Sequence, residues 1–170
     1  MRVAHLIDVV EALNGAGVRY LIVGGLAVNA HGYLRYTNDV DLVIQLDRMN
    51  LLRGLGALES LGYRPKHPVL VTQFADAQLR EQWIVEKGML VFPLWCDVRL
   101  ETPIDVFVRE PFDFAAEWGK ATRCEISEGV LAPFVCLSTL YAMKRQSGRP
   151  QDLADISQLQ IVHDEDRSHE

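Results

Sequence analysis

A glycine pair and two alternating aspartates, separated by one short segment, constrain this chain more than any other feature. Gly24 and Gly25 end the apolar run 20–23, and Asp39 and Asp41 begin the next apolar run. If the second run is a strand, the two aspartates share one face, because side chains alternate along a strand. Two carboxylates held that close repel each other unless a cation lies between them. The pattern therefore predicts a divalent-metal site beside a glycine turn whose backbone N–H groups are open to phosphate.

Length and composition bound the class of protein. The 170 residues suit a single domain, which we expect over 1–162, with a polar tail over 163–170. No apolar run reaches the ~18 residues that cross a bilayer, and the net charge of −6 argues against non-specific binding to nucleic acid. The three cysteines lack metal-ligand spacing and read as reduced thiols: Cys96, Cys124 and Cys136. We therefore expect a cytoplasmic protein with no membrane partner.

Hydrophobic periodicity predicts helices interleaved with short strands. The expected helices are one that starts near Val3 and ends at Gly15, a short one over 26–32, one capped by Asp47 and stopped by Gly62, and three over 76–88, 137–147 and 150–162. The expected strands lie over 20–23, 39–45, 69–71, 89–92 and 103–108. The short helix after the glycine pair would direct its first N–H groups toward an anion there. The pattern assigns no element to residues 109–136.

A third carboxylate, Asp105, lies in the otherwise apolar strand 103–108. An unpaired carboxylate there would be costly, and cations shared with Asp39 and Asp41 would remove that cost. Three carboxylates can hold two Mg²⁺ ions ~3.5–4 Å apart, the arrangement that serves nucleotidyl transfer. Asp97 is the alternative third ligand, and we favour Asp105 because its surroundings are more strand-like. Without a metal, the same aspartates would be a solvated strand face and an ion-pair partner.

Several other residues receive structural interpretations. His31 is expected to pack a helix or lie on the surface. Three polar residues near the C-terminus could form only a network that ties the last helix to the body, which we favour for Asp155: Arg149, Asp152 and Asp155. The tryptophans are expected in the core: Trp83, Trp95 and Trp118.

The order of these parts resembles the nucleotidyltransferase superfamily built around the DNA polymerase β catalytic fold. Its signature is a G-[G/S] turn, then D-x-D, then a third carboxylate on a later strand. The form R-x-T-x-D-x-D over 35–41 looks closest to the small bacterial group related to AbiEii-type toxins and other minimal nucleotidyltransferases. Lys144 followed by the segment 148–155 is similar to that group's K…GR-x-x-D-x-x-D ending. The resemblance implies an α/β fold of the α+β type, with a mixed, mostly antiparallel sheet flanked by helices and a C-terminal helical segment.

The resemblance also implies the roles of individual residues. The nucleotide-binding residues would be Gly24, Gly25, Arg35, Thr37 and Lys144. The catalytic residues and metal ligands would be Asp39, Asp41 and Asp105, with Asp105 also helping to deprotonate the acceptor. It stays open whether Arg35 and Thr37 contact phosphate or brace the aspartate strand. It also stays open whether Lys144 neutralises the triphosphate or serves only the end of its helix.

The expected function is transfer of a nucleoside monophosphate from an NTP to an acceptor hydroxyl, with two Mg²⁺ or Mn²⁺ ions. The acceptor would be a tRNA end, a protein side chain or a small molecule. A toxin–antitoxin or phage-defence role, with an antitoxin-like partner, would fit the relatives. The alternatives are a non-catalytic nucleotide- or partner-binding module of the same fold, against which the intact aspartate set argues, and a metal-dependent phosphohydrolase.

Overall fold

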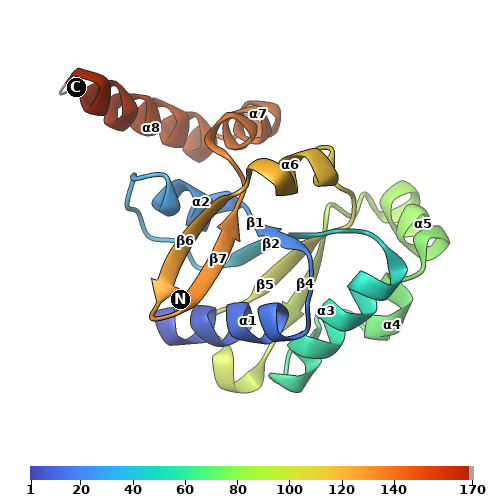
Figure 1. Cartoon of the computed structure of the whole chain (residues 1–170). Helices are drawn as coiled ribbons and strands as arrows, with labels where there is room; N and C mark the ends of the chain where they lie inside the picture. Colours follow the sequence, from blue (N-terminus) through green and yellow to red (C-terminus); the bar gives the residue numbers. More distant parts are fainter. Residues whose placement is uncertain (169–170) are drawn as a thin grey trace.

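A mixed sheet of seven strands forms the centre of the molecule (Figure 1). This computed structural model describes residues 1–168, with side chains as far as Asp164. The strands are β1 (Tyr20–Ile22), β2 (Val40–Ile44), β3 (Arg64–Pro65), β4 (Val91–Trp95), β5 (Ile104–Phe107), β6 (Thr122–Ser127) and β7 (Val130–Phe134). Their order across the sheet is β3-β4-β5-β2-β1-β7-β6. Strands from distant parts of the chain thus meet at the centre.

Most neighbouring strands run antiparallel. The exceptions are the parallel pairs β2–β5 and β1–β7. The expected mixed, mostly antiparallel sheet is therefore confirmed. In the parallel pair β2–β5, Asp41 lies opposite Asp105, and in the antiparallel pair β1–β2, Ile22 lies opposite Leu42. This register places the end of β1 beside the start of β2 and the start of β5.

Helices flank the sheet. They are α1 (Val3–Gly15), α2 (Gly24–Ala30), α3 (Arg48–Ser60), α4 (Val71–Phe74), α5 (Ala77–Lys87), α6 (Phe114–Lys120), α7 (Leu137–Ser147) and α8 (Pro150–Ser168), with a 3₁₀ turn η1 (Asp97–Arg99). Helix α1 packs against α3, while α2 contacts β2 and α7 (Figure 1). Helix α8 follows α7 and extends away from the body of the molecule in Figure 1. Among the described residues, no helix has both the length and the apolar character needed to span a bilayer.

The core forms because the apolar stripes of these elements face inward. Leu6, Val9, Val10 and Leu13 make the buried side of α1. The three residues of β1 are fully buried, which suits a central strand covered on both faces. The three cysteines are free thiols, as expected.

The expected helices with clear caps are confirmed. Asp47 accepts a hydrogen bond from the Asn50 N–H at the start of α3, and Asp76 accepts from the N–H groups of Gln78 and Leu79 at the start of α5. The helix expected over 137–147 has those bounds in the structure. The predicted N-cap at Asp47 was therefore a sound guide for α3.

In the segment 64–102, one predicted strand is absent and another has shifted bounds. The strand expected over 69–71 does not form, because the Gln73 side chain accepts a hydrogen bond from the Leu70 N–H and starts α4 there. The strand expected over 89–92 lies instead at Val91–Trp95, where it pairs with β5. The position of β4 depends on its partner strand, which the local pattern does not contain.

Other boundaries differ as well. Helix α2 begins at the glycine pair itself and ends at Ala30, rather than covering 26–32. Helix α8 continues to Ser168 beyond the expected end at 162, because no glycine or proline follows Pro150 to stop it. The expected polar tail is thus helical as far as Ser168, and 169–170 lie outside the described residues. Helix α6 and strands β6 and β7 fill the segment to which the sequence pattern assigned nothing.

Candidate active site

Three aspartates converge where β1, β2 and β5 meet. Asp41 and Asp105 are directly paired across β2 and β5, and Asp39 precedes Asp41 by two residues. One carboxylate oxygen from each of the three lies within 4.8 Å of the others. The expected grouping of Asp39, Asp41 and Asp105 is therefore present. Asp97 lies apart from it in η1, where its Oδ2 accepts a hydrogen bond from Arg64 Nη2 at 3.1 Å.

The glycine pair is pressed against the aspartate segment. Gly24 has a φ of +64°, and a Cβ added there would lie 1.9 Å from Asp41 Oδ2. A Cβ at Gly25 would lie 2.5 Å from Thr37 Oγ1. The Val23 N–H also donates to the Asp41 carbonyl at 3.0 Å. Side chains at either glycine would displace this segment, so the turn and the aspartates form one unit.

The start of α2 supplies free backbone donors at this turn. Gly24 and Gly25 are its first two residues, and the first N–H groups of a helix have no partner within it. The helix has only seven residues, so the expected contribution of its dipole is small. Any anion bound here would depend mainly on direct hydrogen bonds and on nearby cations.

The electrostatics of the cluster favour a bound cation or proton. Burial raises the pKa of Asp41 to about 7, and the charges of Asp39 and Asp105 add to that rise. Lys144 and Arg149 act in the opposite direction. Burial and the charge of Asp39 also raise the pKa of Asp105. Near neutral pH, full ionisation of all three carboxylates is therefore unfavourable in the absence of a cation.

Asp155 is the centre of a buried ionic network on α8. Its carboxylate is fully buried and accepts hydrogen bonds from Arg35 Nε at 2.7 Å and Arg35 Nη2 at 2.9 Å. Lys144 Nζ donates to the same carboxylate at 2.6 Å and to Asp152 Oδ1 at 2.8 Å, and Gln151 donates at 3.0 Å. The network role expected for Asp155 is thus present. Burial alone would raise the pKa of Asp155, but hydrogen bonds, the strongest from Arg35, outweigh it and leave the pKa below its usual range.

This network engages two residues expected to bind nucleotide. Lys144 is 4% exposed, and its ammonium is shared by two carboxylates. Arg35 also donates to the Tyr36 carbonyl at 3.0 Å, and its Nη2 would lie 3.2 Å from a Cβ at Gly25. Thr37 donates to Asp39 Oδ1 at 3.2 Å. In this arrangement Arg35 and Thr37 brace the glycine turn and the aspartate segment.

Arg149 and Lys66 are two cations whose charges act on the aspartate cluster. Arg149 was interpreted as part of the C-terminal network, yet its side chain is exposed and makes no hydrogen bond or ion pair with the residues described. Its charge acts on Asp41. Lys66 acts on Asp105, and its backbone N–H donates to the Pro93 carbonyl. No local signal marks Lys66, because its place depends on the β3–β4 pairing.

The remaining sequence interpretations are partly confirmed. His31 is half-buried and shares a hydrogen bond with the Val135 carbonyl at 2.8 Å, which is a structural role. Trp83 is in the core, and Trp118 is partly buried against it. Trp95 is 38% exposed, so its expected core position was wrong. It lies two residues from Pro93 on β4 and therefore faces the same side of the sheet as Asp105.

A scan against protein-family models finds no match to this chain, and a search of curated proteins finds no match either.

Proposed function

We propose that this protein is a metal-dependent nucleotidyltransferase with the polymerase β-like fold. One observation carries the proposal: Asp39, Asp41 and Asp105 bring carboxylate oxygens within 4.8 Å of one another beside a glycine turn. Carboxylate oxygens are the ligands that Mg²⁺ and Mn²⁺ prefer, and burial together with the charges of Asp39 and Asp105 raises the pKa of Asp41. The residues present thus fit a divalent-metal site with Asp39, Asp41 and Asp105 as its ligands. Two bound ions would stabilise negative charge on the attacking and leaving oxygens of the transfer.

The glycine turn and nearby cations would bind the triphosphate of the donor NTP. The N–H groups of Gly24 and Gly25 are uncovered by side chains and suit the β- and γ-phosphates. Arg149 is the exposed cation whose charge reaches Asp41, so we assign it the direct phosphate contact. Lys144 contributes from within the network, by its positive charge and by holding Asp155 and Asp152 in place.

Asp105 would accept the proton of the acceptor hydroxyl. A positioned carboxylate can act as the general base in such a step. The hydroxyl oxygen would form a bond to the α-phosphorus while the bond from that phosphorus to the bridging oxygen breaks. Pyrophosphate would leave, and the proton would pass to Asp105.

The experiment that tests this function follows label from an NTP to an acceptor. The wild-type protein is incubated with α-³²P-labelled NTPs, Mg²⁺ or Mn²⁺, and tRNA, protein and small-molecule acceptors. We expect a labelled acceptor with the wild type and none with Asp39→Asn or Asp41→Asn. Equal labelling by wild type and variants would overturn the proposal.

The same materials separate the alternative functions. Calorimetry that finds NTP binding independent of Mg²⁺ and of the aspartates would identify a non-catalytic binding module. Release of labelled NMP or NDP, without a labelled acceptor, would identify a phosphohydrolase. Each outcome differs from the one expected of a nucleotidyltransferase.

A further inference from the structure

Strand β6 forms one end of the sheet and leaves its outer edge open. In the described part of the chain it pairs only with β7, beside which it lies in Figure 1. With six residues it is the longest strand of the sheet. An open strand of this length is a template for a further strand, because its outward N–H and C=O groups lack partners in the sheet.

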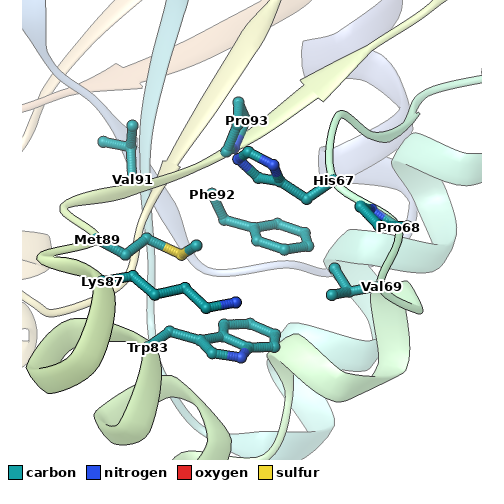
Figure 2. Close-up of a pocket in the computed structure, with 9 residues that line it drawn as sticks. All are labelled: His67, Pro68, Val69, Trp83, Lys87, Met89, Val91, Phe92 and Pro93. Atoms are coloured by element: carbon teal, nitrogen blue, oxygen red, sulfur yellow. The ribbon is translucent and has the colours of Figure 1, made fainter.

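The opposite end of the sheet is closed to such an addition. Strand β3 has only two residues, and the second is Pro65, which has no N–H group to donate. Beyond it, His67 and Pro68 leave the sheet and line a cavity of about 540 Å³ together with Val91 and Pro93 of β4, as Figure 2 shows. Too few backbone groups remain at this end to pair with a further strand.

The backbone groups of β6 that face outward belong to Arg123 and Glu125. The N–H of Val135, directly after β7, donates to a carbonyl of β1, so the odd-numbered residues here direct their backbone groups toward β1. The even-numbered ones, Ala132 among them, face β6 and pair with its even-numbered residues, such as Cys124. The odd-numbered residues of β6 therefore turn their N–H and C=O groups to the open edge.

The same two residues of β6 carry opposite charges. Arg123 and Glu125 are exposed, and neither forms an ion pair with a residue whose side chain is described. The Arg123 guanidinium lies 4.9 Å from the centroid of the Trp118 ring, and Glu125 Oε1 accepts a hydrogen bond from the Gly129 N–H at 2.8 Å. Residues two apart on a strand share a face, so a cation and an anion stand side by side. An edge with charges of one sign would repel a copy of itself, whereas this edge carries one of each.

Only one register pairs both charges with those of a second copy. A two-fold axis makes the two strands antiparallel, and outward-facing residues must then pair with outward-facing residues. An axis at Arg123 would oppose two arginines, and an axis at Glu125 would oppose two glutamates. An axis at Cys124 places Arg123 of each copy opposite Glu125 of the other, which gives two pairs of opposite charge. The backbone directions and the charges therefore agree on the axis at Cys124.

We propose that β6 is an interface between two copies of this chain, paired antiparallel about a two-fold axis at Cys124. Four backbone hydrogen bonds would join Arg123 of each copy to Glu125 of the other, and each charge would gain a partner. The irregular pairing after Glu125 ends the regular part of the edge, so the interface is short and the dimer forms reversibly with concentration. Because β6 contributes none of the three aspartates, this dimer is independent of the proposed function.

The charge pairing is tested by exchanging the two charges. Sedimentation equilibrium from about 20 µM to ~1 mM protein measures association. We expect dimers in wild type and at least about tenfold weaker association in Arg123→Glu, because each dimer then exchanges two attractive pairs for two repulsive ones. Adding Glu125→Arg to that variant should restore association, since opposite charges face each other again. A wild type that is still monomeric at the highest concentration would overturn the proposal.

The matched control is Lys87→Glu, which changes the net charge by the same amount. Lys87 is exposed and lies beside the cavity at the other end of the sheet (Figure 2). We expect this variant to associate as wild type does. An equal weakening in Lys87→Glu and Arg123→Glu would show that net charge alone is responsible and would overturn the interface, as would a double exchange that fails to restore association.

The axis is tested without altering either charge, by oxidation. At a non-hydrogen-bonded pair the two Cys124 Cα atoms would lie ~4.5 Å apart, within the ~4.4–6.8 Å that a disulfide spans. Added copper phenanthroline would take two electrons from the two thiols, which lose two protons as the Sγ–Sγ bond forms. We expect a covalent dimer in wild type and in Cys136→Ser, and none in Cys124→Ser. Cys136 is half-buried like Cys124, so cross-linking through Cys136 at the same rate would show random collision and overturn the proposal.

Discussion

Gly24 and Asp41 lie so close that a Cβ at residue 24 would sit 1.9 Å from the Asp41 Oδ2 atom. Gly24 also has a φ of +64°, a conformation that residues with side chains rarely adopt. The glycine is therefore required twice, once by its backbone and once by the carboxylate beside it. Any change at residue 24 moves a proposed metal ligand, which makes this position a sensitive probe of the site.

We expect Gly24→Ala to abolish the stabilisation of the protein by Mn²⁺. Gly17→Ala is the matched control, because Gly17 has a φ of +61° and no atom within 4 Å of an added Cβ. Both variants should lose about 1 kcal/mol to backbone strain, and Gly24→Ala should lose more through the contact with Asp41. Urea unfolding gives the stabilities, and thermal melting with and without Mn²⁺ gives the metal response. Equal metal responses in the two variants would refute the link between the turn and the metal site.

The pH dependence of the metal-free protein should reveal the crowded carboxylates. The folded-state pKa of Asp41 is raised from 3.8 to about 7, so the folded state holds this proton more tightly than the unfolded state. Its contribution to stability is complete below the unfolded pKa and is lost as pH rises through about 7. We therefore expect Asp41→Asn to be more stable than wild type at about pH 8, by about 2 kcal/mol, with the difference shrinking toward about pH 4.

Bound Mn²⁺ should reverse the difference in stability between wild type and Asp41→Asn. Protons compete with metal for Asp41, so Mn²⁺ should stabilise wild type more at about pH 8 than at about pH 6. Asp41→Asn should show little metal response at either pH. The measurement is urea unfolding across this pH range with and without Mn²⁺. A wild type whose metal response does not depend on pH would contradict the proposed ligand.

The choice between two candidate third carboxylates gives a direct comparison of variants. Asp105 is grouped with Asp39 and Asp41, whereas Asp97 makes an exposed pair with Arg64. We expect Asp105→Asn to lower nucleotidyl transfer by at least about a hundredfold, because a metal ligand contributes several kcal/mol to charge stabilisation. Asp97→Asn should keep both the transfer rate and the metal response. Initial rates with labelled NTP check this, and equal losses in the two variants would remove Asp105 from its assigned role.

The parts of the site that lie close in sequence were predictable, because their signals are local. The glycine pair and the Asp39-x-Asp41 alternation follow from residue types and from the period of a strand. Asp105 was predictable as an unusual carboxylate in an apolar strand, and its register opposite Asp41 emerged only from strand pairing. Whether those residues bind metal stays a prediction.

The parts that depend on distant partners were not predictable. Lys66 and the cavity at Pro93 depend on how β3 and β4 join the sheet edge, which no local pattern records. Trp95 was expected in the core, and its position near that edge leaves it partly exposed. Strand β6 lies at one end of the sheet and pairs only with β7. Its residues are therefore partly exposed, and its sequence lacks the apolar run typical of a buried strand.

Removing Asp155 should cost more stability than removing any exposed acidic residue. Asp155 is fully buried and pairs with both Arg35 and the buried Lys144, so among the described residues its loss leaves the Lys144 ammonium with only Asp152 as an ionic partner. We expect Asp155→Ala to lower the free energy of unfolding by about 3–5 kcal/mol, the usual effect of breaking a buried ion pair. Asp97→Ala, which breaks the exposed pair with Arg64, should cost less than about 1 kcal/mol.

The pH dependence of the stability lost in Asp155→Ala should identify the ionic origin of that loss. The pKa of Asp155 is lowered in the folded state, so its contribution is present above the unfolded pKa and is lost as pH falls through the folded value. The difference between wild type and Asp155→Ala should therefore shrink in acid, and urea unfolding at a series of pH values measures it. Because Arg35 and Lys144 connect Asp155 to the glycine turn and to α7, the variant should also weaken the Mn²⁺ response. A variant with full metal response and wild-type stability would show that α8 does not support the site.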